Sequence, residues 1–124
     1  MADRSVTFTG TQTGDALRRL YESSHIAVST LALHRKGLSS ASELKAREYC
    51  AIGIPFIACG NDPDFPDDPP FRLRVANDDR PNDVAAVMAE FARHHQRFDD
   101  AGQRRYAADH LDWRHKLAAL GLMP

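Results

Sequence analysis

The sequence lacks the segments by which chains are exported or anchored in a membrane. Its first residues, MADRSV, do not place an apolar run after basic residues, and the longest apolar stretch, YCAIGIPFIAC, is too short and interrupted to cross a bilayer. The 16 basic and 17 acidic residues are mixed along the chain and leave a net charge of -1, which gives nucleic acid no broad positive field. We therefore expect a cytosolic protein with no transmembrane segment and no nucleic-acid partner.

Common catalytic and metal-binding motifs are also missing. GxSxG, GxxxxGKS/T and GxGxxG do not occur, which removes the commonest hydrolase, phosphate-loop and dinucleotide-binding classes. Cys50 and Cys59 lie in apolar stretches without metal-ligand spacing, so we expect both to be reduced packing residues. The six histidines have no supporting Cys or Asp cluster. We expect neither a metal site nor a cofactor.

Strand-like and helical segments alternate along the chain. Its 124 residues, 43% hydrophobic and 27% charged, fit one globular domain. We expect strands over residues 6–9, 26–30, 55–59 and 71–75, and helices over residues 16–21, 43–50, from 82 onward, 101–109 and 113–120. This order predicts an α/β fold: a partial doubly wound, Rossmann-like, mostly parallel sheet of about four strands with flanking helices.

Two segments add detail to the predicted sheet. Residues 60–70, GNDPDFPDDPP, are dense in Pro and Asp and predict a surface loop without helix or strand. Residues 71–75 alternate apolar and basic side chains, which predicts an edge strand with Arg72 and Arg74 facing water. Ligands of such sheets bind beyond the carboxyl ends of the strands, so the loops after the first three strands are the expected binding region.

Glu48 is the most informative single residue. Leu44, Glu48 and Ile52 fall on one face of the predicted helix, so a carboxylate interrupts an apolar stripe. Burying it unpaired costs roughly several kcal/mol, whereas a ribose diol supplies two hydroxyl donors. Periodicity alone favours a simpler interpretation, in which Glu48 lies at the margin of the stripe and pairs with Lys45 or Arg47.

The start of the same helix is a second candidate site. Residues 39–44 form a turn of mostly small residues, with Ser42 as the expected cap, and Gly53 suits the left-handed position after the helix. Such a turn presents free N–H groups and the positive end of the helix dipole to a phosphate. A plain capping turn without a ligand is the alternative, and it is favoured until a ligand is known.

Basic residues surround this turn. Arg35 and Lys36 lie in the preceding loop and Lys45 in the first turn of the helix, so three cations could converge on a pyrophosphate. The alternative is that these side chains are solvated and that Glu43 and Arg47 form an i,i+4 ion pair.

At REYCAIGIPFIA the sequence resembles the E-x-x-A-x-G-x-P-V-I signature of retaining glycosyltransferases with two Rossmann-like domains, the GT-B fold, and family 4 especially. Glu48, Ala51, Gly53, Pro55 and Ile57 match it. The variant ELKAREYCAIGIP is closer still to a subgroup found in bacterial surface-polysaccharide enzymes. The runs VTFTG and LYESSHIAVST are similar to the segment before the signature, and LDWRHKL is similar to the closing helix of the family.

The resemblance implies a donor-binding domain that binds a nucleotide-diphosphate sugar and transfers the sugar to an acceptor with retention and without a metal. It implies that Glu48 binds the ribose and that the amides of a preceding turn approach the diphosphate and sugar, here Ser40, Ala41, Ser42, Glu43 and Leu44. Many members carry a further Glu at the position of Ser40, which raises the question whether Glu43 or Lys45 takes over its role.

The family's donor domain begins with a strand, a helix and a second strand, and an N-terminal acceptor domain faces it. This sequence shows counterparts of neither. We therefore expect residues 1–124 to be one domain, the C-terminal part of a truncated donor domain that is inactive alone, in a protein that is cytoplasmic or peripheral at the inner membrane. Strand 6–9 would lack its neighbours and strand 26–30 would have an open edge, which predicts homo-oligomers through sheet edges.

Two other interpretations stay open. One is a non-catalytic Rossmann-like binding or interaction domain that keeps only the fold. The other is a flavodoxin-like regulatory domain, which is disfavoured because no acidic cluster follows the first strand and no Lys ends a late one.

Overall fold

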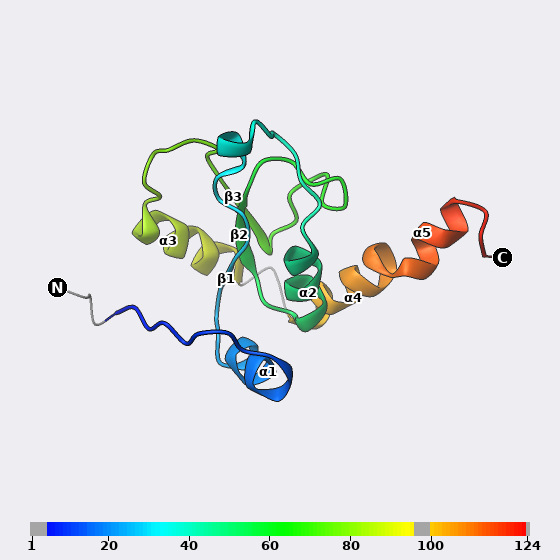
Figure 1. The fold of residues 1–124 in the computed structure, drawn as a ribbon, viewed down its shortest axis with the longest axis horizontal. Helices are drawn as coiled ribbons and strands as arrows, with labels where there is room; N and C mark the ends of the chain where they lie inside the picture. The colour runs from blue at the N-terminus through cyan, green and yellow to red at the C-terminus, as the bar shows by residue number, and fades with distance from the viewer. Residues whose placement is uncertain (1–4, 96–99, 124) are drawn as a thin grey trace.

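Residues 5–95 and 100–123 are described by the computed structural model, which combines helices and strands (Figure 1). In chain order the elements are α1 (Gly14–Glu22), β1 (Ala27–Val28), the 3₁₀ turn η1 (Leu33–Lys36), α2 (Leu44–Ile52), β2 (Phe56–Cys59), β3 (Arg72–Val75), α3 (Val84–His95), α4 (Asp100–Tyr106), the π-helical turn η2 (Ala107–Leu111) and α5 (Trp113–Ala119). The predicted α/β class is confirmed.

The strands form one parallel sheet in the order β1-β2-β3. Ala27 of β1 pairs with Phe56 of β2, and Phe56 pairs in turn with Arg72 of β3, so β2 is the central strand. Parallel neighbours need a crossover, and α2 lies in the crossover between β1 and β2. The predicted parallel arrangement is confirmed for these three strands.

Residues 6–9 are not the strand that the sequence predicted. They are irregular, and the side chain of Phe8 is 94% exposed. A strand needs a neighbour for its backbone hydrogen bonds, and the sheet of the described residues ends at β1. This sheet therefore has three strands rather than four. The outer edge of β1 is partly covered, because the Tyr49 hydroxyl donates to the carbonyl oxygen of Val28 at 3.2 Å.

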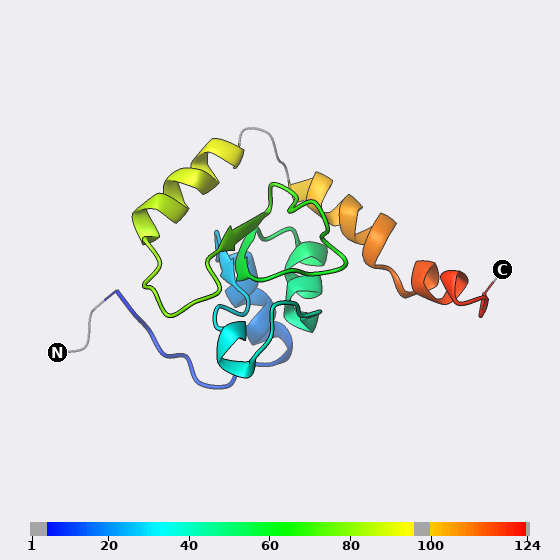
Figure 2. The same cartoon turned by 90° about the horizontal axis from the view of Figure 1, so that it is seen from above.

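Helices lie on both sides of the sheet, α2 and α4 on one side and α3 on the other (Figures 1 and 2). The core fills the α2 side, where Phe56 packs edge-on against Phe65 with 5.7 Å between ring centroids. Phe65 in turn stacks on Tyr106 at 5.8 Å. On α2 the small residues Ala46 and Cys50 face this aromatic cluster. Each buried aromatic ring contributes roughly 1.5–3 kcal/mol to stability.

The β2–β3 loop, residues 60–70, is not a plain surface excursion. It contains neither helix nor strand, as predicted, but Phe65 is fully buried and Asp62 is only 4% exposed. It also covers Arg72, which was predicted to face water. Arg72 is 4% exposed and donates to Asp68 Oδ1 at 2.6 Å and to the carbonyl oxygen of Gly60 at 2.9 Å. The second arginine of β3 is exposed, as predicted.

The predicted left-handed glycine after α2 is confirmed, and a second one follows α5. Gly53 follows α2 with φ 94°, and Gly121 follows α5 with φ 73°, the left-handed conformation that glycine adopts without strain. Asp112 caps α5 by accepting a hydrogen bond from the backbone N–H of Arg114 at 2.8 Å. Figure 2 shows α4 and α5 leading away from the sheet toward the C-terminus. Within the described ranges, no helix has the length and apolar character needed to cross a membrane.

Candidate functional site at the start of α2

The turn before α2 is fixed against the loop that follows β2. Ala41 donates to the carbonyl oxygen of Asn61 at 3.0 Å, and Asn61 donates to that of Ser39 at 2.9 Å. Gly60 permits this approach, because a Cβ atom there would lie 2.8 Å from the Ser39 oxygen and 2.7 Å from Leu33 Cδ1. The start of α2 therefore lies beyond the carboxyl ends of β1 and β2, where open α/β sheets bind ligands.

The first turn of α2 has no side-chain cap. Glu43 is the N-cap residue in an extended conformation, and its side chain accepts no capping hydrogen bond. Ser42, the predicted cap, instead accepts a hydrogen bond at its Oγ from Arg47 Nη2 at 2.7 Å. The positive end of the helix dipole is therefore not offset by a capping side chain, and Leu44 beside it is 73% exposed.

Glu48 lies on the exposed side of α2, so the expected apolar stripe is wrong. Leu44 and Ile52 are both exposed, and the helix turns Ala46 and Cys50 to the core instead. The partner of Glu48 is the Tyr21 hydroxyl, which donates to Oε2 at 3.4 Å. Burial and the nearby carboxylate raise the pKa of Tyr21. Glu48 is thus accessible to solvent and has one long hydrogen bond.

The i,i+4 ion pair between Glu43 and Arg47, the alternative interpretation, is replaced by other contacts of Arg47. Arg47 Nη1 donates to the backbone oxygen of Glu43 at 3.0 Å, while its other contacts reach Asp62 and Asp64. Lys45 lies half-buried in the first turn of α2. The predicted site residues from Ser40 to Glu48 thus lie in the turn before α2 and in the first turns of that helix.

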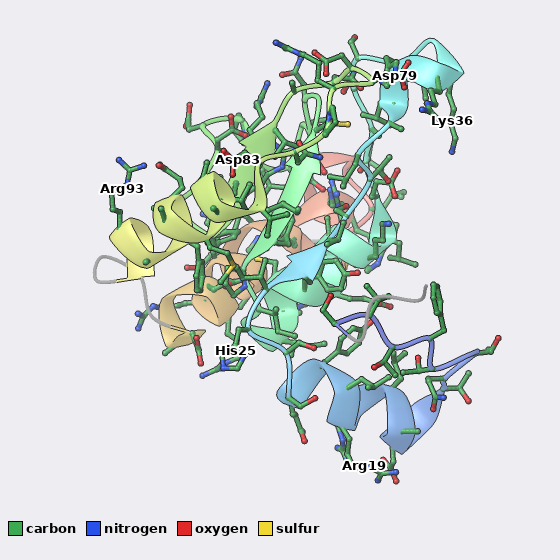
Figure 3. All side chains as sticks on the ribbon, turned by 90° about the vertical axis from the view of Figure 1, so that its left-hand side faces the viewer. Arg19, His25, Lys36, Asp79, Asp83 and Arg93 are labelled. Atoms are coloured by element: carbon green, nitrogen blue, oxygen red, sulfur yellow. The ribbon has the colours of Figure 1, made fainter. Side chains whose placement is uncertain are left out.

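Within the described residues, no hydrogen bond or ion pair of the Arg35 and Lys36 side chains reaches that segment. Both lie in η1, and Arg35 Nη2 is 2.6 Å from Asp79 Oδ1 in the loop after β3. Figure 3 shows Asp79 and Lys36 at the same end of the molecule. The convergence of three cations on the helix start stays a prediction.

The most strongly bound cation near the site, Arg47, was not predicted as a site residue. It binds Asp62 at 2.5 Å and Asp64 at 2.7 Å, and Lys116 of α5 binds Asp64 at 2.8 Å. Its guanidinium also lies over the ring of Phe65, 5.4 Å from the centroid. No local pattern gives these partners, because they come from α2, the β2–β3 loop and α5.

The volumes and positions of two cavities bear on where a ligand could bind. The one at the carboxyl ends of the strands has a volume of about 10 Å³, room for one water molecule at most, and its lining includes Thr30, Leu33 and Glu43. A cleft of about 430 Å³ lies at the opposite ends of the strands, between Tyr21, Pro55 and Arg104. It contains none of the predicted site residues. A ligand at the start of α2 would therefore bind on an open surface.

The chemistry of the remaining side chains adds two observations. Burial raises the pKa of the Cys50 thiol to about 12, so this cysteine stays protonated and is a packing residue. The described residues contain no group of three or more His, Cys, Asp or Glu side chains that could hold a metal ion.

Comparison of the chain with protein-family models, with curated proteins and with solved structures finds no match.

Proposed function

We propose that this chain binds a nucleoside-diphosphate sugar as the donor-binding part of a retaining glycosyltransferase with the GT-B, Rossmann-like arrangement. The position of Glu48 carries the proposal. Its carboxylate is exposed on α2, one turn after a helix start that has no side-chain cap. That helix follows β1 of a parallel sheet, at the edge where folds of this kind bind nucleotides.

The parts of the ligand match the groups at this surface. Ribose hydroxyls donate hydrogen bonds to the Glu48 carboxylate. Phosphate oxygens accept from the first N–H groups of α2 and are attracted by the helix dipole, and Lys45 adds a positive charge in the first turn. In a transfer reaction the same groups would stabilise the diphosphate as it leaves.

The wider role follows from the resemblance around Glu48. In this proposal the protein is cytoplasmic and its sugar goes to an acceptor in bacterial surface-polysaccharide or glycoconjugate synthesis. Transfer would also require an acceptor-binding domain, so the chain alone is expected to bind the donor without turning it over.

A second candidate function is a non-catalytic interaction domain. It is supported by large apolar side chains that lie in water, among them Phe8 at 94% and Trp113 and Leu120 at 72% exposed. Exposed apolar side chains mark contact sites for other proteins where they gather into one patch. The small cavity at the strand ends also fits a domain without a small-molecule ligand.

Titration with UDP, GDP and their sugars, followed by amide chemical shifts, separates these two functions. Donor binding is expected to shift residues 40–48, and Glu48→Gln should weaken it about tenfold, because a hydrogen bond to a charged group is lost. Glu22→Gln removes a carboxylate from α1 and serves as the matched control with unchanged affinity. If millimolar ligand causes no shifts, the chain is an interaction domain rather than a donor-binding one.

A further inference from the structure

Three nitrogen atoms of η1 gather around one carboxylate oxygen. Arg35 Nε donates to Asp79 Oδ1 at 2.8 Å, and Arg35 Nη2 lies 2.6 Å from the same oxygen. His34 Nε2 lies 3.1 Å from it, although without the alignment of a hydrogen bond. Among the described residues, both ring nitrogens of His34 are buried and lack a hydrogen-bond partner. The cluster therefore has the form of an anion site that holds a carboxylate from its own chain.

A second set of contacts holds η1 in place without Asp79. The side-chain oxygen of Asn77 accepts from the backbone N–H of His34 at 2.8 Å and from Cys59 Sγ at 3.4 Å. Its side-chain nitrogen donates to the carbonyl oxygen of Leu38 at 3.0 Å. Because Asn77 joins η1 to the ends of β2 and β3, the Asp79 carboxylate can leave while η1 keeps its position.

The pair itself is exposed. The side chains of Arg35 and Asp79 are 69% and 68% exposed, so water solvates either group once they separate. Exposed ion pairs of this kind contribute little to stability. Phosphate presents oxygens that fit the planar guanidinium fork as carboxylate oxygens do, and it carries more charge.

We propose that His34 and Arg35 form a phosphate-binding site that Asp79 occupies as an internal competitor. The inference rests on the proposed function in one respect, namely that the phosphate belongs to the diphosphate of the donor. His34 is a specificity-determining residue of this site, because its Nε2 atom lies 3.1 Å from the Asp79 carboxylate without hydrogen-bond alignment and can supply an aligned donor to a phosphate oxygen. Asp79 lowers the affinity for phosphate by the strength of one exposed ion pair.

The test compares two neighbouring aspartates with inorganic pyrophosphate as the probe. Asp79→Asn releases Arg35, whereas Asp78→Asn makes the same change of charge at a residue that pairs with Arg80. We expect Asp79→Asn to bind pyrophosphate about threefold more tightly than the unmodified chain, the size of one exposed pair, and Asp78→Asn to bind as the unmodified chain does. Adding Arg35→Gln to Asp79→Asn should abolish the gain.

Equal affinities of the two Asn variants would overturn the inference, as would a gain that survives Arg35→Gln or a failure of Asp79→Asn to bind millimolar pyrophosphate. Pyrophosphate has no ribose, so these results do not depend on Glu48. If UDP binding depends on Glu48 but Asp79→Asn changes nothing, the inference alone fails. If Asp79→Asn strengthens pyrophosphate binding but Glu48→Gln leaves UDP binding unchanged, the proposed function alone fails.

Discussion

Two of the arginine–aspartate clusters among the described residues have the same chemistry and opposite exposure. In the buried cluster, Arg47 is 14% exposed and binds Asp62 and Asp64, which are 3% and 18% exposed. In the surface cluster of His34, Arg35 and Asp79, both members of the arginine pair are more than two-thirds exposed. Water can replace a partner in the second cluster but not in the first. Burial therefore separates an ion pair that holds the fold from one that is free to exchange its anion.

The buried cluster joins three parts of the chain. Arg47 comes from α2, the two aspartates from the β2–β3 loop, and Lys116 from α5. Burial of Arg47 disfavours its charged form, but hydrogen bonds to Asp62 and Asp64 outweigh this effect and raise its pKa. The Tyr106 hydroxyl adds a hydrogen bond to the backbone oxygen of Asp64 at 2.8 Å. These contacts explain how a loop dense in aspartate packs beneath the sheet.

The largest expected effect is the loss of stability in Arg47→Met. This change leaves the carboxylate of Asp62 buried without its cation, which costs about 3–5 kcal/mol in comparable pairs. Urea denaturation measures the loss, and Arg35→Met is the matched control, for which we expect no measurable change in midpoint. A similar small loss in both variants would show that burial does not distinguish the two clusters.

A smaller effect is expected from the ion pair between Lys116, the more exposed cation of the buried cluster, and Asp64. Burial raises the pKa of Asp64, but hydrogen bonds from Lys116 and Arg47 outweigh it and set the pKa below the ordinary value of 3.8. A carboxyl with a lowered folded pKa stabilises the fold above its unfolded pKa and loses this contribution as the pH falls through the folded value. We therefore expect the free energy of unfolding to fall as the pH drops below 3.8.

Lys116→Met tests whether the Asp64 carboxylate causes this loss of stability at acid pH. It should lower the free energy of unfolding by about 0.5–1 kcal/mol at neutral pH, a value reduced because Lys116 is 38% exposed, and it should flatten the acid slope. Lys36→Met in η1 is the control with an unchanged profile. An acid slope that is the same in both variants would assign the pH dependence to other carboxyls.

The sequence predicted elements well where local pattern decides them. The left-handed glycine at Gly53 depends on neighbouring residues only, and it was found. The strand over residues 55–59 follows from an apolar run and that over residues 71–75 from an alternating pattern, each between turns, and both were found. The strand at residues 6–9 failed because strand composition is not sufficient without a pairing partner.

The predictions of which side chains are buried on α2 and β3 were wrong where residues distant in the sequence decide burial. The i,i+4 spacing of Leu44 and Ile52 predicted a buried stripe, yet α2 approaches the aromatic core through its small residues Ala46 and Cys50. Arg72 is buried because a loop covers it, which strand alternation does not encode. At the candidate site, the turn before α2 was predictable from its small residues. The engagement of Arg35 by Asp79 was not, because 44 positions separate them.

The smallest expected effect on stability belongs to Asp79→Asn, which tests whether the exposed cluster contributes to the stability of the fold. Its carboxylate has a pKa lowered by the hydrogen bond from Arg35 and by the nearby His34 ring, but all three groups regain water when the contact is lost. We expect an unchanged denaturation midpoint at low and high salt, because Asn77 still holds η1. Asn77→Ala, which removes those hydrogen bonds, should lower the midpoint by an amount equivalent to about 1 kcal/mol. If Asp79→Asn destabilised the fold as much as Asn77→Ala, Asp79 would be a structural anchor rather than an exchangeable anion.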